Sequence, residues 1–313
     1  MKNALMIHNP RAGNSGRHRL RALEESRRVL HAAGIETTLE EVSAPGDTAE
    51  LARNAASEGR DLLIVCGGDG TLNEAVNGLV ASPGGGQVPL ALLPGGTANI
   101  LAKELGLPWD FSRAASRLAG ATPRKIALGL ATPLEEPGKR RHFLCVAGAG
   151  PDGAIVHAVD LELKGRAGIL AYWYEGARQL FGYTFPKFRL RAAEHSLEAS
   201  LVIAGRTKHY GGPFQITTEA SLFEDCFEFA ALETQSAWRY LSYLPTLWLG
   251  GLRGVPGVHY WKADAVVCEP LGPEPVYAQV DGEPLARLPV EFRIVPGALT
   301  LLVPQPAPRA RVA

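Results

Sequence analysis

The stretch GGDGTLNEAVNGL at residues 67–79 is followed by LPGGTANILAKELGLP at residues 93–108. In each stretch, glycines come after a short apolar run, at 62–66 and 90–93, and before a segment with helical periodicity. A buried strand, a glycine turn and a helix form a βα unit, and successive units build a parallel sheet. The two stretches therefore predict two glycine turns at the carboxyl edge of one α/β sheet.

The flanking sequence continues this alternation through residue 125. We expect further strands at 4–8 and 35–42 and helices at 17–33, 47–57, 71–81 and 97–105. Helices on both faces of a parallel sheet are the expected arrangement. Residues 1–125 are thus predicted to form an N-terminal α/β domain.

After residue 125 the pattern changes to short strands separated by Gly, Pro and polar turns, which is typical of an antiparallel sandwich or barrel. The expected strands are 125–131, 142–147, 185–192, 197–204, 227–232, 263–269, 276–280, 290–295 and 299–303, with helices at 169–181 and 237–249. We assign residues 126–303 to this second domain and expect 304–313, which is rich in proline, to be an extended tail.

Composition and charge narrow the class of protein. Lys plus Arg equals Asp plus Glu at 32 each, so a nucleic-acid partner is not expected. The four cysteines are too widely spaced for a zinc knuckle or a redox pair and are interpreted as reduced core thiols. Neither a secretory leader nor a membrane span is expected, because residues 1–9 lack the apolar core of a leader and no apolar run reaches the roughly 20 residues that span a bilayer. We expect a cytoplasmic protein.

The glycine turns carry the candidate chemistry. Turns at 67–74 and 93–99, with a third at 9–16 after the first strand, would bring backbone N–H groups to one sheet edge, where they bind phosphate oxygens. Asp69 inside such a turn suggests a magnesium nucleotide, because a carboxylate alone would repel phosphate. The alternative for each turn is a tight connection without a ligand. A Walker motif is absent, and the GAGPDG string at 148–153 is a weak dinucleotide signal.

These motifs together resemble the diacylglycerol kinase catalytic family of soluble bacterial lipid kinases, related to sphingosine and ceramide kinases. The first motif is shared with NAD kinases and phosphofructokinases, and the second is more specific to lipid kinases. GAGPDGAIV at 148–156 and VDGEPL at 280–285 extend the resemblance over nearly the whole chain. The resemblance implies an NAD kinase-like α/β domain, a C-terminal β-sandwich, and use of ATP and Mg2+.

The resemblance also implies roles for particular residues. It implies four catalytic carboxylates. Asp281 and Glu283 resemble the acidic pair that accepts the proton from the lipid hydroxyl, with Glu283 favoured as the base and Asp281 in a metal-linked hydrogen-bond network with Asp152. Asp69 would order the magnesium and phosphate environment. A two-residue hairpin turn is the alternative for Asp281 and Gly282. The residues expected to hold ATP are Asn9, Pro10, Arg11, Ala12, Gly13, Ser43, Gly67, Gly68, Asp69, Gly70, Thr71, Leu72, Asn73, Glu74, Gly96 and Thr97.

A structural magnesium site is implied where relatives commonly read Asp-Gly-x-Leu-Asp. Here the corresponding residues are 224–228, EDCFE. Asp225 keeps a carboxylate, and the carbonyls of Leu222 and Phe227 are the other candidate ligands. Cys226 replaces a glycine, the residue that reaches backbone angles other residues rarely adopt, so a bound ion and its absence are both open alternatives here.

The acceptor is expected to be a diacylglycerol-like or sphingoid lipid, met at the inner face of the membrane. The aromatic helices at 169–181 and 237–249 would line an acyl-chain pocket or enter the membrane interface, but packing against the core is the favoured interpretation. NAD kinase and a non-catalytic lipid or nucleotide binder are the alternative functions. The lipid's identity and the oligomeric state, including a homodimer, stay open.

Overall fold

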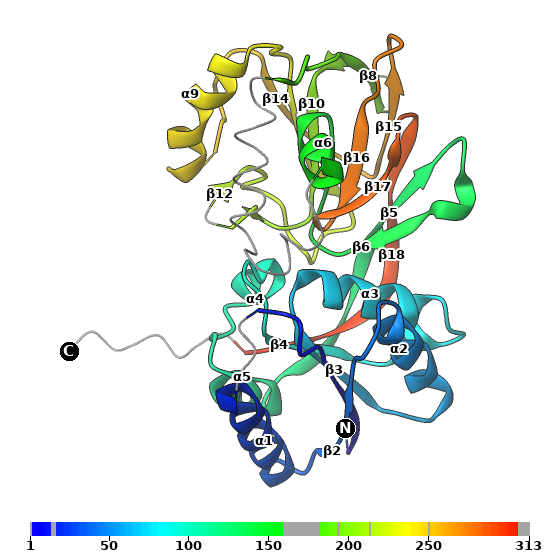
Figure 1. Cartoon of the computed structure of the whole chain (residues 1–313), viewed down its shortest axis with the longest axis vertical. Helices are drawn as coiled ribbons and strands as arrows, with labels where there is room; N and C mark the ends of the chain where they lie inside the picture. The colour runs from blue at the N-terminus through cyan, green and yellow to red at the C-terminus, as the bar shows by residue number, and fades with distance from the viewer. Residues whose placement is uncertain are drawn as a thin grey trace, which may run out of the picture. The chain divides into compact units, whose positions relative to one another are not determined.

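A computed structural model describes residues 2–13, 17–158, 182–192, 195–212, 214–249 and 251–305. The chain divides into two compact units, shown with their elements in Figure 1. Unit 1 comprises Met1–Lys125 and Ala298–Ala313, and unit 2 comprises Ile126–Gly297. Residues 298–303, which the sequence analysis assigned to the second domain, fall in unit 1 because the last strand ends in the sheet of that unit.

Unit 1 is built on a parallel sheet with the strand order β2, β1, β3, β4 and the end of β18. Every residue of β3 and β4 is buried, as expected for central strands covered on both faces. The strands are β1 (Asn3–His8), β2 (Glu36–Glu41), β3 (Leu62–Gly67), β4 (Leu90–Pro94) and β18 (Val290–Val303).

The helices of unit 1 form two packed pairs on opposite faces of this sheet (Figure 1). α1 packs on α5, and α2 packs on α3, where a side chain at Gly78 would overlap the carbonyl of Ala49. The helices are α1 (Arg17–Ala32), α2 (Asp47–Ser57), α3 (Asp69–Val80), α4 (Ile100–Glu104), α5 (Phe111–Ala119) and the 3-10 turn η1 (Gly85–Gln87).

Helix starts differ from the sequence-based expectation at both glycine turns. α3 begins at Asp69 rather than at residue 71, so Asp69 lies in its first turn. α4 begins at Ile100 rather than at residue 97, because Asn99 has a φ of 47° and cannot continue a right-handed helix. The second glycine turn is therefore a longer loop than periodicity indicates.

Unit 2 contains two antiparallel layers. One sheet has the order β14, β13, β10, β7, β16, β17, and the other contains β18, β15, β8 and β9, with β5 and β6 joined through β18. The elements are β5 (Thr122–Pro133), η2 (Pro137–Lys139), β6 (Arg141–Phe143), β7 (Val146–Ala149), α6 (Pro151–Ala158), β8 (Phe188–Ala192), β9 (His195–Ala199), β10 (Leu201–Gly205), β11 (His209–Tyr210), β12 (Phe214–Gln215), β13 (Phe227–Leu232), α9 (Ala237–Trp248), β14 (Val258–Ala263), β15 (Ala265–Pro270), β16 (Tyr277–Val280) and β17 (Glu283–Arg287).

Aromatic rings from both sheets fill the core of unit 2. Phe143 stacks on Phe227 with ring centroids 5.5 Å apart and meets Phe292 edge-on at 6.3 Å. All three rings are completely buried. Such ring pairs add to the free energy of burial and fix the spacing of the two layers.

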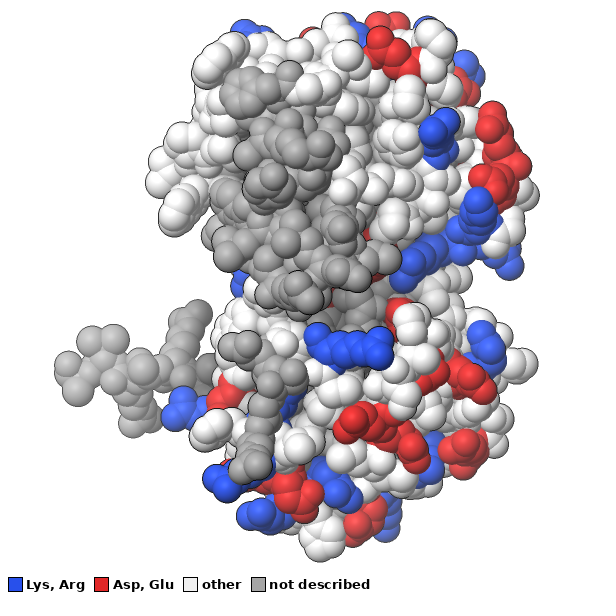
Figure 2. Space-filling model, in the orientation of Figure 1, with Lys and Arg blue, Asp and Glu red and all other residues white. Residues whose placement is uncertain are grey.

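The predicted fold class is confirmed: a parallel α/β domain followed by an antiparallel sandwich. Single strands expected at 142–147 and 197–204 are each broken into two, and β18 is continuous over the two strands expected at 290–295 and 299–303. The helix expected at 169–181 lies outside the described residues. On the face shown in Figure 2, each unit carries both acidic and basic side chains, in keeping with the balanced composition.

Candidate functional site

The candidate nucleotide-binding edge of unit 1 is formed by segments that follow its parallel strands. Asn9 follows β1, Ser43 lies beyond β2, Gly68 follows β3 and Gly95 follows β4. Because the strands are parallel and paired in register, these segments share the carboxyl edge of the sheet. The structure thus brings the predicted turns of unit 1 together.

The two glycine turns touch through backbone atoms. The N–H of Gly95 donates to the carbonyl of Gly67 at 2.8 Å, and a Cβ at position 96 would come 2.5 Å from the Cα of Gly68. A Cβ at Gly67 would also come 2.7 Å from the Cβ of Thr71. Side chains are excluded at these glycine positions, which leaves the main chain of the turns open to a ligand such as phosphate.

The first turn joins this edge through Asn9 and Gly13. Asn9 Nδ2 donates to Thr71 Oγ1 at 2.9 Å, and its Oδ1 accepts from the N–H of Arg11 at 2.9 Å. Gly13 has a φ of 69°, and a side chain there would overlap the carbonyl of Gly95. The described residues of this turn are 9–13, since residues 14–16 fall outside the described part of the chain.

Asp69 connects the first glycine turn to the helix after the second. Its Oδ1 accepts a hydrogen bond from the N–H of Ile100 at 2.8 Å, at the start of α4. Burial lowers the pKa of the nearby Lys103 ammonium, and the negative charge of Asp69 acts in the opposite direction. The carboxylate therefore already has a structural function, holding two turns in register.

Several residues predicted to contact ATP are buried or already hydrogen-bonded within the protein. Leu72 is buried and its N–H donates to Gly68 O at 3.0 Å within the helix, while Asn73 is buried. Thr97 is exposed on the second turn. The N–H of Ser43 donates to Asp47 at 2.9 Å, and the N–H groups of Ala44 and Ser43 lower the pKa of that carboxyl. Pro10 and Ala12 lie in the turn after β1, whereas Gly70 and Glu74 lie in the first turns of α3.

Sequence analysis missed Arg19. The Arg19 guanidinium donates to the carbonyl of Ala12 and lies 5.4 Å from the centre of the Phe111 ring. Within the described residues, its Nε and Nη2 are buried without a hydrogen-bond partner. Asn99 holds the second turn, accepting from the N–H of Gly96 at 2.9 Å and donating to its carbonyl at 2.8 Å. Nothing in the arginine-rich pattern of 17–28 distinguishes Arg19 from its neighbours.

In unit 2, Asp281 is held by main-chain donors. Its carboxylate accepts from the N–H groups of Leu144, Cys145 and Val146 at 2.8, 2.9 and 3.0 Å. Asp281 and Gly282 form the two-residue turn between β16 and β17, with φ of 48° and 79°. The hairpin alternative thus describes the backbone correctly, with positive φ at both central positions.

Asp152 belongs to a buried network beside this turn. It accepts from the hydroxyl of Tyr210 and, at 2.6 Å, from Gln279 Nε2, and burial raises the pKa of Asp152. Gln279 Oε1 in turn accepts from the N–H of Gly282 at 2.8 Å. The network therefore connects Asp152 to the turn that precedes Glu283, the partly exposed first residue of β17.

The glycines of the 148–153 string serve packing. A side chain at Gly148 would overlap the Asp152 carboxylate, and one at Gly153 would overlap the carbonyl of Tyr277. Gly150 has a φ of 107° and donates to Tyr277 O at 3.0 Å. They allow α6 to pack closely on β7 and β16.

The candidate metal ligands form a different arrangement. Leu222 O accepts a hydrogen bond from Arg206 Nη2 at 2.8 Å, Asp225 is exposed, and Phe227 is the first residue of β13. Cys226 is absent from the described non-glycine residues with positive φ. No cluster of three or more His, Cys, Asp or Glu side chains suited to a metal occurs among the described residues.

Comparison with known families identifies the class. The diacylglycerol kinase catalytic domain matches residues 3–131, and the YegS C-terminal NAD kinase beta sandwich-like domain matches residues 145–303. The second match alone covers half of the 313 residues. The chain belongs to the diacylglycerol kinase family, and the enzyme is a lipid kinase. The resemblance seen in the motifs is confirmed.

Relatives match along most of their length. The chain is 28% identical over 302 residues to a diacylglycerol kinase of Bacillus subtilis (strain 168), covering 93% of each, and 29% identical over 294 residues to one of Staphylococcus aureus (strain MRSA252), covering 93% and 89%. A crystal structure of a diacylglycerol kinase from Bacillus anthracis str. Sterne superposes with a TM-score of 0.72 at 22% identity, and another solved chain from that organism with 0.78 at 23%; each match covers 98% of both chains. At these identities the structures support the fold alone.

No helix in the described part of the chain has the length and hydropathy needed to cross a bilayer.

Proposed function

We propose that this lipid kinase transfers the γ-phosphoryl group of ATP to a hydroxyl of a diacylglycerol-like or sphingoid lipid. The observation that carries the proposal is the direct backbone contact between the turns at Gly67–Gly68 and Gly95–Gly96. Turns whose glycines leave main-chain atoms uncovered, next to the N-terminus of α3, favour a polyphosphate.

On the nucleotide side, we assign phosphate binding to the main chain of the three turns. Arg19 supplies positive charge beneath them, and phosphate oxygens would satisfy its buried donors. Asp69, at the first turn of α3, is the carboxylate suited to a cation carried by the phosphates. Mg2+ bound with ATP would neutralise charge on the phosphates during transfer.

On the acceptor side, we assign Glu283 as the general base. The oxygens of Asp281 and Asp152 accept hydrogen bonds from protein groups, which favours structural roles for these two carboxylates. Glu283 follows a turn whose backbone these groups fix. It would take the proton from the lipid hydroxyl as that oxygen bonds to the γ-phosphorus and the bond to the β-phosphate oxygen breaks, releasing ADP.

The test compares a total lipid extract before and after incubation with the protein and magnesium ATP, using mass spectrometry. We expect a lipid that gains one phosphoryl group, and its loss in Asp69→Ala and Glu283→Ala with the fold retained by circular dichroism. Full activity in both variants would refute the assigned roles. Glu198→Gln, an exposed carboxylate on β9, is the matched control.

Two alternatives are separated by a second assay, in which the protein is incubated with labelled ATP and either NAD or the lipid extract. Transfer of label from ATP to NAD rather than to lipid would favour an NAD kinase. This alternative is considered because the second domain matches an NAD kinase beta sandwich-like domain. Binding of ATP without transfer to any lipid would favour a non-catalytic binder.

We also propose that α9 brings the enzyme to the cytoplasmic face of the membrane. Trp238, Trp248 and Leu249 are 72%, 71% and 87% exposed, whereas Tyr243 is the buried residue of the helix. Packing against the core, favoured on sequence grounds, is therefore wrong for the two tryptophans. Exposed Trp and Leu on one helix are typical of interfacial binding.

Vesicle sedimentation tests this role. Trp238→Ser with Trp248→Ser should reduce binding to phosphatidylcholine vesicles containing diacylglycerol by about tenfold, because two interfacial aromatic side chains are lost. Trp109→Ser, which removes an exposed tryptophan of unit 1, is the control. Equal binding of both variants would contradict the role of α9.

A further inference from the structure

Arg206 is a completely buried arginine in unit 2. It follows β10, and its side chain is among the largest with essentially no exposure. Its N–H donates to Cys145 O at 2.8 Å. A guanidinium is costly to bury, and here Nη1 and Nη2 have acceptors while Nε has none among the described residues.

The acceptors of Arg206 lie in the segment to which the resemblance assigned a metal. Nη2 donates to Leu222 O at 2.8 Å, and Nη1 donates to Glu224 O at 3.2 Å. Burial lowers the pKa of Arg206, while Cys145, Asp225, Cys226 and Asp281 act to raise it. A guanidinium remains protonated throughout the physiological range, so this segment already contains a fixed positive charge.

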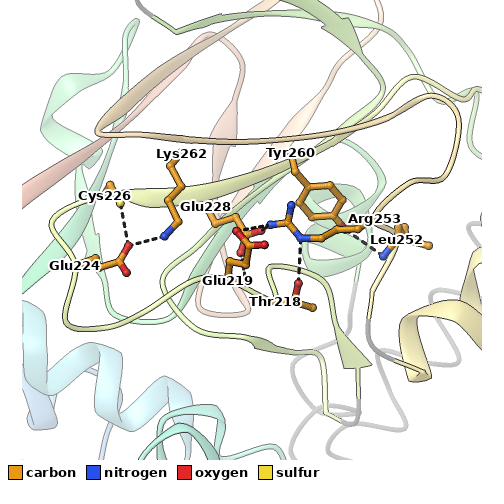
Figure 3. Close-up of polar contacts among 9 residues, drawn as sticks. All are labelled: Thr218, Glu219, Glu224, Cys226, Glu228, Leu252, Arg253, Tyr260 and Lys262. Carbon is orange, nitrogen blue, oxygen red and sulfur yellow. Dashed lines mark hydrogen bonds and ion pairs between the residues drawn. The ribbon is translucent and has the colours of Figure 1, made fainter.

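Other side chains make polar contacts with the same segment, residues 219–228, as Figure 3 shows. Lys262 Nζ donates to the Glu224 carboxylate at 2.7 Å. Glu228, which is 1% exposed, accepts from the N–H of Glu219 at 2.6 Å and pairs with Arg253. Protein groups thus hold the segment from Glu219 to Glu228 at both ends and in the middle.

This arrangement does not fit a divalent ion at Leu222. The carbonyl that would bind the ion accepts from Arg206, and an ion placed there would face a like charge across a short distance. Asp225, the candidate carboxylate ligand, is exposed. Position 226, where the resemblance implies a glycine, is a cysteine. Cys226 is not one of the described residues with a positive φ, so its backbone does not adopt the left-handed conformation.

We infer that the Arg206 guanidinium takes the place of a structural magnesium ion in this chain, so that unit 2 folds without a divalent metal. Arg206 also connects the segment to the acidic turn, because its N–H binds Cys145 O while the N–H of Cys145 binds Asp281 at 2.9 Å. The inference concerns unit 2 alone and is independent of any magnesium bound with ATP.

The first experiment uses the full-length wild-type protein without nucleotide. Thermal unfolding in excess EDTA and in excess MgCl2 should give the same Tm, and elemental analysis after dialysis should find no stoichiometric divalent metal. A Tm that falls in EDTA and recovers with Mg2+, or one retained divalent ion per chain, would overturn the inference. Neither readout depends on kinase activity.

The second experiment replaces the guanidinium. Arg206→Ala should lower Tm by about 10 °C in EDTA, since it removes the side-chain donors of the buried Leu222 carbonyl and the Glu224 carbonyl and leaves a cavity. Mg2+ or Ca2+ should then raise Tm by several degrees, and Asp225→Ala in the same background should abolish that response. An unchanged Tm in Arg206→Ala, or a destabilised variant indifferent to both ions, would count against a cation site.

Matched variants complete the test. Arg293→Ala removes an exposed arginine of unit 2 that pairs with Glu291 and should leave Tm unchanged within about 1 °C. If Arg206→Ala does not fold, Asp225→Ala in the wild-type background decides the question. It should keep the wild-type Tm in both EDTA and Mg2+, whereas a fall in Tm accompanied by loss of bound metal would refute the inference.

Discussion

The edge of unit 1 and the acidic turn of unit 2 are built by opposite means. In unit 1, glycines remove side chains so that main-chain atoms line the edge, as at Gly68 and Gly96. In unit 2, main-chain N–H groups are instead used up in holding a side chain, the Asp281 carboxylate. Adding a single methyl group should therefore be most damaging in unit 1, and changing a charge most damaging in unit 2.

The largest effect is expected for Gly96→Ala. Its Cβ would come 2.5 Å from the Cα of Gly68, so the two turns must separate. We expect kcat/KM for ATP to fall by about 100-fold or more, because misplacement of roughly 1 Å is enough for such a loss. Isothermal titration with ATP and steady-state kinetics would measure it.

Gly120→Ala is the control for this change, since nothing lies within 4 Å of its Cβ position. Wild-type ATP affinity in Gly96→Ala would mean that the contact between the turns is not needed for ATP binding. It would contradict the expectation that an added methyl group is most damaging in unit 1.

An intermediate effect is expected for Asp281→Asn. The amide group would place donors opposite N–H groups, so we expect a loss of about 2–3 kcal/mol in the free energy of unfolding. Glu283→Gln should instead preserve stability while lowering kcat by at least about 100-fold. Denaturant titration and kinetics on both variants would separate the structural carboxylate from the proposed base. Equal losses of stability and of kcat in the two variants would contradict different roles for Asp281 and Glu283.

The smallest effect concerns pH. His8 is buried, and burial followed by the charge of Arg19 lowers its pKa, while Glu41 acts in the opposite direction. The unfolded chain therefore binds a proton more readily, and stability should fall as pH drops below about 6.5. His8→Leu should make this fall shallower in Tm scans between pH 7.5 and 5.5, without abolishing it, because burial also lowers the pKa of His142 and His157.

Exposed His31→Leu is the control for this comparison. A His8→Leu profile that parallels the wild type would show that His8 contributes nothing to the acid dependence of unit 1.

The sequence predicts the edge of unit 1 well because its determinants are local. Strand, glycine turn and helix follow one another along the chain, and parallel pairing then brings Asn9, Gly68 and Gly95 to one edge. The predicted start of α4 at residue 97 is wrong, because the left-handed backbone of Asn99 depends on its hydrogen bonds to Gly96, which periodicity does not show. These are errors of a few residues within a correct architecture.

The contacts of unit 2 are harder to predict from the sequence because they join residues that are far apart along the chain. Asp281 meets residues 144–146 and Arg206 meets Leu222 only through strand pairing, and no motif marks either contact. For α9, the aromatic pattern predicts the helix correctly but does not tell which face is covered. The roles assigned to Glu283 and to the ATP-binding residues stay predictions.

The course of β18 bears on how the protein is made. Its second half, with Leu299, Leu301 and Leu302 fully buried, pairs with β4, yet it leaves the ribosome after all of unit 2. Until then β4 presents an open, wholly apolar border, the kind of surface on which nascent chains associate. Truncation before residue 298 would make that transient exposure permanent, so cells would recover such a fragment mainly from inclusion bodies.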